Sequence, residues 1–311
     1  MDWFYLILIV TGLALFEIII SIDNAIINAE VLSTMSEKGK KWFLFYGILI
    51  AVFLVRGLLP WMILWISTPG LGFVGSFVAS FSSDPTVIKA IKESAPILLI
   101  GGGTFLVFLF LHWLFLESKH YGLMGEKLIQ RYGAWFYAIV SVLLVTIVWM
   151  SIEYNPLMAL GAVIGSSAFF ISHGFKENAE QAEKRMLEGS RAMSDISKIF
   201  YLEAIDTSFS IDGVLGAFAF TFVIPLILIG NGIGAVVVRQ LTVANIDRVK
   251  KYRFLKNGAM YSIFTLGGVM ICHSFGLHIP DWLSPVLTFF IIGYFFWKSL
   301  KALKMECQEL N

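Results

Sequence analysis

Five acidic side chains lie inside two apolar stretches of this sequence. They are Glu17, Asp23, Glu203, Asp206 and Asp212. A charged residue at the centre of a membrane helix costs roughly 2.5–3.5 kcal/mol on insertion scales, so a group of acids requires protons, basic partners or a bound cation. Acids in such surroundings mark ion pathways and binding sites, and we expect these acids to form a site.

The side chains that could bind a metal in both stretches offer oxygen atoms, which indicates the kind of cation that would bind. Hydroxyl and amide groups accompany the acids, and neither stretch contains a histidine or a cysteine. Ligation by oxygen alone favours a hard divalent cation such as manganese, magnesium or calcium over zinc or copper. The predicted metal ligands are Glu17, Ser21, Asp23, Asn24, Glu203, Asp206, Ser210 and Asp212.

Two arginines, Arg56 and Arg239, lie within or near the end of the apolar runs that follow the acidic stretches. We expect them either to pair with the acids or to extend toward the membrane surface. Two arginines do not balance five acids, and the remaining negative charge suits a divalent cation.

The spacing of the acids places only some of them on one helix face. Glu17 and Ser21 are four residues apart and share a face, whereas Asp23 points roughly 120° away in a regular helix. The same holds for Asp212 in the second stretch. We therefore expect either an unwound turn, which Gly213 would permit, or a different partner for these two acids.

An internal repeat relates the two halves of the chain. An acid, a serine four residues later and a second acid two residues further occur in both acidic stretches. The next apolar run in each half places an arginine nine residues after a glycine, as in Gly47 with Arg56 and Gly230 with Arg239. The two stretches run in opposite directions in the topology below, which predicts an inverted three-helix repeat of the kind common in secondary transporters.

The composition indicates an all-α, polytopic membrane protein. Of its 311 residues, 58% are hydrophobic and 14% are charged, and the mean hydropathy is +0.79. Soluble domains carry roughly 25% charged residues. About nine apolar runs are near the length that crosses a bilayer, roughly 20 residues. The predicted spans are 3–31, 42–66, 95–116, 134–151, 156–172, 199–222, 224–243, 257–275 and 283–302.

Lysine and arginine in the loops predict the orientation. Segments rich in these residues follow spans one, three, five and seven and end the chain, while the opposite loops hold only Lys89 and Lys92. The positive-inside rule then places the N-terminus outside and the C-terminus in the cytoplasm. It also makes 173–198 a solvated cytoplasmic helix. The segment 67–94, broken by glycine and proline, is predicted to be a loop or a short re-entrant piece.

These features divide the chain into four parts. They are 1–116, the first repeat; 117–198, an inserted hairpin with a charged loop; 199–275, the second repeat; and 276–311, the last helix and the tail. The lipid bilayer is the expected partner besides the ion. No basic patch with interleaved aromatic residues indicates nucleic-acid binding. The sequence leaves the oligomeric state open.

The motif from Glu17 to Asn24 resembles the first-helix signature of the TerC family of tellurium-resistance-associated membrane proteins. The segment from Asp206 to Asp212 is similar to the second acidic helix of that family, and the resemblance covers most of the chain except 117–198. It implies a LysE-type transporter fold, metal-binding acids at the motif positions, and above all manganese export across the bacterial inner membrane. Glu203 and Ser208 are additional to the usual pattern, as is the inserted hairpin, and Gly213 replaces a frequent serine.

Three classes of function are compatible with buried acids. The leading hypothesis is a transporter of a divalent cation, which is not an enzyme. An intramembrane enzyme that uses paired carboxylates is the second, although no HExxH or GxSxG motif is present. The third is a non-transporting scaffold that assists metallation or stress resistance. Ion flux separates the first class from the other two, because an enzyme or a scaffold should move no ion.

Overall fold

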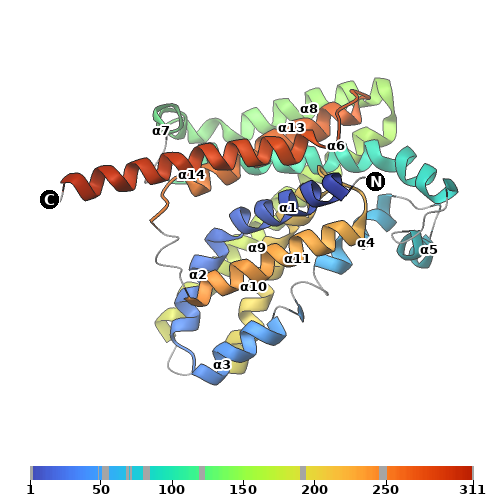
Figure 1. The fold of residues 1–311 in the computed structure, drawn as a ribbon. Coiled ribbons are helices and arrows are strands. Elements are labelled where there is room, and N and C mark those ends of the chain that lie inside the picture. Colours follow the sequence, from blue (N-terminus) through green and yellow to red (C-terminus); the bar gives the residue numbers. More distant parts are fainter. Residues whose placement is uncertain are drawn as a thin grey trace.

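The computed structural model describes residues 3–47, 49–50, 56–67, 70, 72–79, 85–118, 123–189, 194–244 and 251–309. In this part of the chain all regular structure is helical, as predicted (Figure 1). The helices are α1 Trp3–Ile20, α2 Ile22–Ser33, α3 Glu37–Trp42, the π-helix η1 Phe43–Gly47, α4 Arg56–Ser67, α5 Gly72–Ala79, α6 Pro85–Leu116, α7 Met124–Gln130, the 3-10 helix η4 Gly133–Trp135, α8 Phe136–Tyr154, α9 Pro156–Gly189, α10 Asp195–Ala217, α11 Ile224–Ala244, α13 Leu255–Ser274 and α14 Leu283–Glu309.

Six helical stretches among the described residues are long and apolar enough to cross a membrane. They are Trp3–Ile20, Glu93–Leu116, Gly133–Tyr154, Pro156–Asn178, Ile224–Thr242 and Leu283–Met305. The outer helices α8 and α14 expose most of their apolar side chains, which suits contact with lipid. The chain is therefore built as a multi-pass membrane protein. The predicted spans 199–222 and 257–275 correspond to α10 and α13, which are continuous but less apolar.

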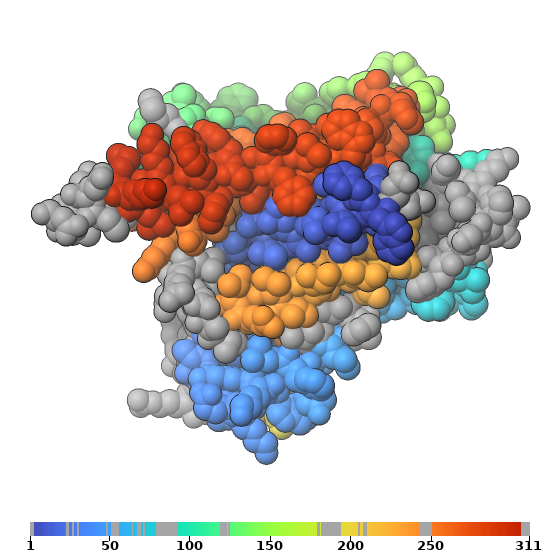
Figure 2. All heavy atoms as spheres, in the orientation of Figure 1, coloured from blue at the N-terminus to red at the C-terminus, as the bar shows by residue number. Residues whose placement is uncertain are grey.

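The helices pack in layers around α1 and α6. The long helix α14 lies along α13, which packs on α6, and α6 packs on α9 in turn (Figure 1). The N-terminal helix α1 lies between α14 and α11, as Figure 2 shows on one face of the molecule. The main core buries Leu13, Phe16 and Phe220 together with apolar residues of α6, α9, α10 and α13. These contacts place the acidic stretch of α1 inside the bundle.

The glycine run of α6 allows two helices to approach closely. A Cβ atom at Gly101 would lie 2.8 Å from the carbonyl oxygen of Gly161 on α9. A Cβ atom at Gly103 would lie 2.9 Å from the carbonyl oxygen of Gly267 on α13. Small residues at helix contacts of this kind are typical of membrane proteins.

For two segments the structure distinguishes between the alternatives expected from the sequence. The segment 67–94 contains α5 and the beginning of α6 at Pro85, so a large part of it is helical and not a plain loop. The unwound turn that Gly213 would permit does not occur, because α10 continues through this residue to Ala217. The span predicted as 42–66 begins at the last residue of α3 and includes η1 and all of α4 except Ser67, while residues 48 and 51–55 lie outside the described part.

The first predicted span is two consecutive helices that meet at Ser21. The backbone N–H of Ser21 still donates to the carbonyl of Glu17 at 3.1 Å, and Ala25 N–H donates to Ser21 at 2.9 Å. The junction is therefore a local irregularity and not an unwound turn. It lies one helical turn beyond Glu17, inside the acidic motif.

Helix α9 extends much further than the predicted span 156–172. It runs for 34 residues to Gly189, so the beginning of the predicted loop 173–198 continues the membrane helix. Lys176 lies in this continuation and is buried, with an exposed fraction of 9%. The prediction that 173–198 is a solvated helix is wrong at this lysine, whose partner is described below.

Candidate functional site

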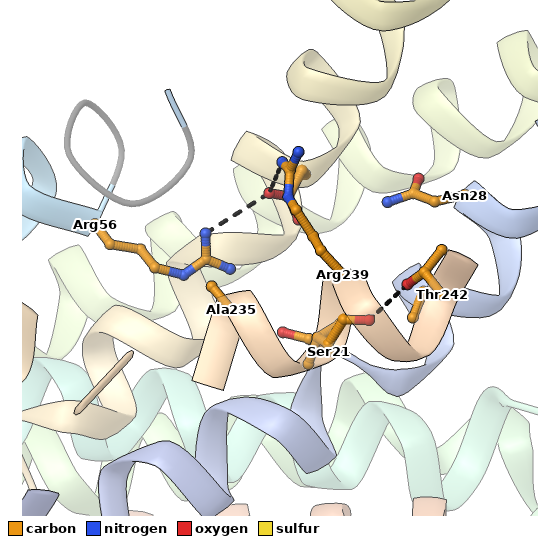
Figure 3. A pocket seen from close by; sticks show the side chains of 9 residues that line it. Ser21, Asn28, Arg56, Ala235, Arg239 and Thr242 are labelled. Carbon is orange, nitrogen blue, oxygen red and sulfur yellow. Dashed lines mark hydrogen bonds and ion pairs between the residues drawn. The ribbon is translucent and has the colours of Figure 1, made fainter. Parts of the chain in front are cut away.

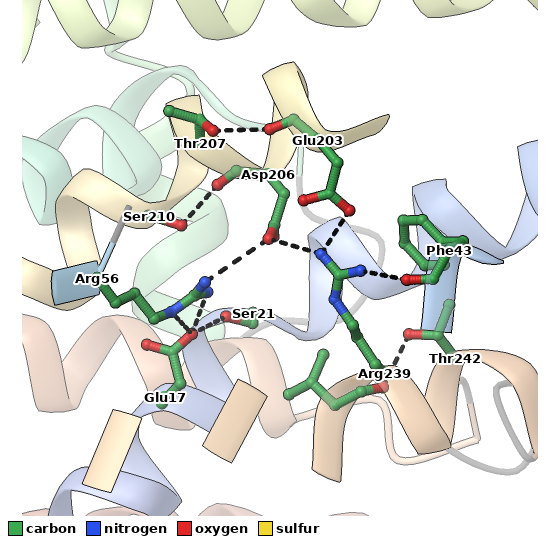
Figure 4. Close-up of polar contacts among 11 residues, drawn as sticks. Glu17, Ser21, Phe43, Arg56, Glu203, Asp206, Thr207, Ser210, Arg239 and Thr242 are labelled. Carbon is green, nitrogen blue, oxygen red and sulfur yellow. Dashed lines mark hydrogen bonds and ion pairs between the residues drawn. The ribbon is translucent and has the colours of Figure 1, made fainter. Parts of the chain in front are cut away.

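Arg56 at the start of α4 joins acids from the two halves of the chain. Its Nε and Nη2 atoms donate to Glu17 Oε1 on α1 at 3.1 and 2.6 Å. Its Nη1 atom lies 3.6 Å from Asp206 Oδ2 on α10 (Figure 4). Arg56 and Glu17 are both almost completely buried, so water screens these contacts little. The acids of two distant segments therefore share one guanidinium.

Arg239 of α11 holds the other side of Asp206. Its Nη2 atom donates to Glu203 Oε1 at 2.8 Å and to Asp206 Oδ2 at 3.3 Å. Its Nη1 atom donates to the carbonyl oxygen of Phe43 at 2.9 Å, and the guanidinium lies 4.3 Å from the centre of that phenyl ring. We call Glu17, Arg56, Glu203, Asp206 and Arg239 the arginine network. Both arginines contact buried acids, which is the first of the two arrangements expected for them.

The hydroxyl groups of the two motifs donate hydrogen bonds to different kinds of acceptor. Ser21 Oγ donates to Glu17 Oε1 at 2.9 Å and belongs to the edge of the arginine network. Ser210 Oγ donates to the backbone carbonyl of Asp206 at 2.6 Å, and Thr207 Oγ1 donates to that of Glu203 at 2.7 Å. Ser210 and Thr207 thus bond back to their own helix, and their oxygen lone pairs stay available as acceptors.

Asp212 lies apart from the arginine network. It accepts a hydrogen bond from Lys176 Nζ of α9, and both side chains are buried. The 120° offset between the acids of α10 therefore gives Asp212 a different partner, which is one of the two outcomes expected from the spacing. The side chains of Asp23 and Asn24 lie outside the part that the structure describes, and only their helical backbone in α2 is defined.

Two glycines make room for Glu17 between neighbouring helices. A Cβ atom at Gly213 of α10 would lie 2.7 Å from Glu17 Oε2. A Cβ atom at Gly234 of α11 would lie 2.6 Å from the Cβ atom of Glu17. Gly213 therefore serves close approach of the carboxylate and not a helix break.

A small pocket with a mixed polar and apolar lining lies beside the arginine network. Its lining residues are Ser21, Ala25, Asn28, Arg56, Asp206, Ala235, Val238, Arg239 and Thr242 (Figure 3). Asn28 is buried at 6% exposure, and its Oδ1 atom makes no hydrogen bond within the described part of the chain. An oxygen acceptor without a partner beside buried charges indicates a place for water or a ligand.

Further oxygen atoms near the acids lack partners. Glu203 Oε2 and Asp212 Oδ1 are buried and make no hydrogen bond to any described residue. The side-chain amide of Asn231 on α11 is fully buried, and it also makes no hydrogen bond to any described residue. Among the described residues no group of three or more histidine, cysteine or acidic side chains is already arranged around a common point as metal ligands. The acids instead contact cationic side chains.

Lys176 and Asn28 were not among the predicted site residues. The sequence holds a signal for Lys176, because the apolar window of α9 extends over Pro156–Asn178 and encloses this lysine. Asn28 follows Ser21 by seven residues, which is two turns along the same helix face. The spacing of Glu17 and Ser21 already defined this face, and extending it by two turns would have found Asn28.

The chain belongs to a family of proteins of unknown function described as DUF475, whose model matches residues 22–306. The match begins just after α1, so Glu17 and Ser21 lie outside it. It includes Glu203, Asp206, Asp212 and both arginines of the network. Neither the comparison with curated proteins nor the comparison with solved structures found a match.

Proposed function

We propose that this chain is a secondary transporter that moves a hard divalent cation, with manganese as the first candidate, across the bacterial inner membrane. Export by alternating access at the buried carboxylates is the proposed activity. One observation carries this proposal: Glu17 of α1 and Asp206 of α10 contact the same guanidinium in the interior of a bundle of apolar helices. Buried acids from distant segments suit a multivalent hard cation, as do the unpaired oxygen atoms of Glu203 and Asp212 on the same helix as Asp206.

The net charge of the arginine network favours binding of a doubly charged cation. Its three acids exceed its two arginines by one negative charge. Asp23, two residues after Ser21 in the sequence, contributes a second negative charge near this motif. The arginines keep the acids together between transport cycles and lower their affinity for a cation. Weaker binding favours release, which a transporter needs as much as binding.

The proposed topology has nine spans. Helix α10 has 23 residues and α13 has 20, which correspond to about 35 and 30 Å at 1.5 Å per residue. Both lengths match a hydrocarbon core of about 30 Å. Helix α10 is less apolar because it carries the acids of the site. With the six apolar helices and the run 42–66, these two complete the nine spans, with the N-terminus outside and the C-terminus in the cytoplasm.

The contacts of the arginines support the inverted repeat. In the alignment of the two halves, Glu17 corresponds to Asp206 and Arg56 corresponds to Arg239. Each of these acids contacts the arginine of its own half, and Arg56 also contacts the acid of the other half. Two related units that meet at such a site are the usual basis of alternating access.

A contact between α2 and α10 is the proposed gate at one end of the site. Ser36, just after α2, donates through its backbone N–H and its hydroxyl to Asp195 at the start of α10. Lys198 donates to the carbonyl and hydroxyl oxygens of Thr34 at 3.1 and 2.9 Å. We call these four residues the polar latch. Beneath it lies an apolar plug, which consists of Val31, Leu32, Met35, Phe43, Ile199 and Leu202.

The latch and the plug lie on the path from this end to the arginine network. Phe43 of the plug contacts Arg239 directly, so the apolar layer borders the network. On the proposed topology this end faces the cytoplasm. Opening it requires the two motif helices to separate, because α2 continues the Glu17 helix and α10 carries Asp206.

Flux through reconstituted protein tests the proposed function. Purified protein in liposomes is supplied with manganese, magnesium, calcium or zinc, and ion movement is followed with an internal metal-sensitive dye. We expect flux of manganese, with magnesium and calcium as the alternatives, and less flux of zinc. The Asp206→Asn variant should lose the flux.

The matched control is Glu126→Gln, which also neutralises a buried carboxylate. Glu126 of α7 bonds to Asn257 and to the backbone of Leu123, away from the arginine network. This variant should transport at about the wild-type rate. The proposal is contradicted if folded wild-type protein moves none of the four ions, or if Asp206→Asn transports as fast as Glu126→Gln.

A further inference from the structure

The ion pair between Lys176 and Asp212 is separate from the arginine network. Lys176 comes from α9, in the inserted part of the chain, whereas the arginines come from the helices that follow the two acidic motifs. The Lys176 and Asp212 side chains have exposed fractions of 11% and 7%. A charge pair with so little contact with water needs both partners, since removal of one leaves a buried charge unbalanced.

Asp212 has capacity for a second partner. Its Oδ2 atom accepts from Lys176, while its Oδ1 atom is buried and makes no hydrogen bond to any described residue. A carboxylate has about four acceptor positions, and a hard cation uses the same oxygen atoms. Asp212 follows Asp206 on the same helix, and the adjacent Gly213 borders Glu17. The free oxygen therefore lies on a helix that already reaches the arginine network.

Lysine and arginine differ in how firmly they hold a carboxylate. Arg56 and Arg239 each bridge two acids with a planar group of several donors, which fixes their geometry. Lys176 presents a compact ammonium group on a flexible chain of four methylene groups. Such a group resembles a small cation in charge and size. It is able to leave one position and return to it without moving the helix.

We propose that Lys176 is a tethered counter-ion, whose ammonium group occupies a cation position at Asp212 and competes there with the transported ion. This inference rests on the proposed function. In the ion-free protein the ammonium group balances Asp212. When the divalent cation binds, it takes Asp212 as a ligand and the ammonium group withdraws. Its return lowers the affinity for the ion and promotes release.

The test measures affinity and turnover separately in the Lys176→Gln variant. Removal of the competitor leaves Asp212 free for the cation, so the Kd for manganese should fall by at least about tenfold, which corresponds to about 1.4 kcal/mol. The maximal flux should fall as well, because release is slower. Lys176→Arg keeps the charge and should restore most of the wild-type Kd. Lys127→Gln, on the exposed face of α7, removes a lysine outside the site and should change neither quantity.

The double variant Lys176→Gln with Asp212→Asn covers the case in which Lys176→Gln does not fold. It contains no unbalanced charge at this position, and we expect it to fold and to bind manganese more weakly than the wild type. Wild-type affinity and flux in this folded double variant would show that the pair is only structural and would overturn the inference. An unchanged Kd in folded Lys176→Gln would overturn it too. Failure of the proposed function is distinct, since the wild type itself would then neither bind nor move the ion.

Discussion

Glu17 and Asp206, which lie in opposite halves of the chain, are held together by the guanidinium of Arg56, at 2.6 Å from the first acid and 3.6 Å from the second. Arg239 lies 3.3 Å from Asp206 on its other side. Asp206 is therefore the point at which the contacts of both arginines converge (Figure 4). Changes at this point should affect the stability of the bundle and its ability to bind an ion.

Arg56→Gln should destabilise the protein strongly. Breaking a buried ion pair by removing one partner costs about 3–5 kcal/mol, because the remaining charge stays buried. Arg56→Lys should recover only part of the loss, since one ammonium group does not reproduce the contacts of Nε, Nη1 and Nη2. Thermal unfolding of the purified protein in detergent measures the effect. Arg131→Gln, at an exposed position after α7, is the control and should unfold like the wild type.

An unchanged unfolding temperature of Arg56→Gln would contradict the structural role assigned to this arginine. A lower unfolding temperature in both Arg56→Gln and Arg131→Gln would point to general sensitivity of the protein to arginine substitution.

Gly234→Ala should reduce both stability and ion binding. The new methyl group would lie 2.6 Å from the Cβ atom of Glu17 and 2.8 Å from the carbonyl oxygen of Ala14, so α1 and α11 have to separate. This separation displaces Glu17 from Arg56. Gly268→Ala on α13 is the matched control, because nothing lies within 4 Å of its added Cβ atom. It should be neutral or slightly stabilising, since alanine favours helix by about 1 kcal/mol over glycine. Equal behaviour of the two variants would refute the close contact.

Asp195→Ala should open the proposed gate. The variant loses the acceptor of both Ser36 hydrogen bonds, and the polar latch then depends on Lys198 and Thr34 alone. A cysteine in place of Leu202, which is fully buried in the apolar plug, reports the opening through its rate of modification by a polar maleimide. The background for this measurement carries serine at Cys272 and Cys307. We expect modification several-fold faster than with an intact latch.

Glu37→Ala is the control for the gate. Glu37 is also an acid in the first turn of a helix, and it contacts Lys40 on the surface and not the latch. Modification at the wild-type rate is expected in this variant. If Asp195→Ala and Glu37→Ala give the same rate, the contact between α2 and α10 does not close the site.

Much of the site was predictable because buried acids are rare enough to be informative. The apolar surroundings of Glu17, Asp206 and Asp212 predicted a helical membrane protein with charge partners inside it. The repeated spacing drew attention to Arg56 and Arg239, for which pairing with the acids was one of two expectations. The 120° offset of Asp212 predicted that it would leave the common helix face or unwind the helix.

The partners of the individual acids were not predictable from spacing. Which acid meets which arginine depends on how α4 and α11 pack against the motif helices, and no sequence distance encodes that packing. Lys176 was not among the predicted site residues because it lies beyond residue 172, the predicted end of span five, where polar residues begin. A buried lysine close to the end of a membrane helix looks in sequence like the start of a loop, and only its contact with Asp212 distinguishes the two.

The most direct test of the account is the binding of manganese to purified protein, followed by electron paramagnetic resonance as free ion disappears. We predict that the wild-type chain binds the ion, and that Glu17→Gln and Asp206→Asn each abolish binding although the two acids lie on different helices. Glu126→Gln should bind as the wild type does. Binding that persists in a folded Glu17→Gln, Asp206→Asn double variant would contradict the claim that these acids hold one ion together.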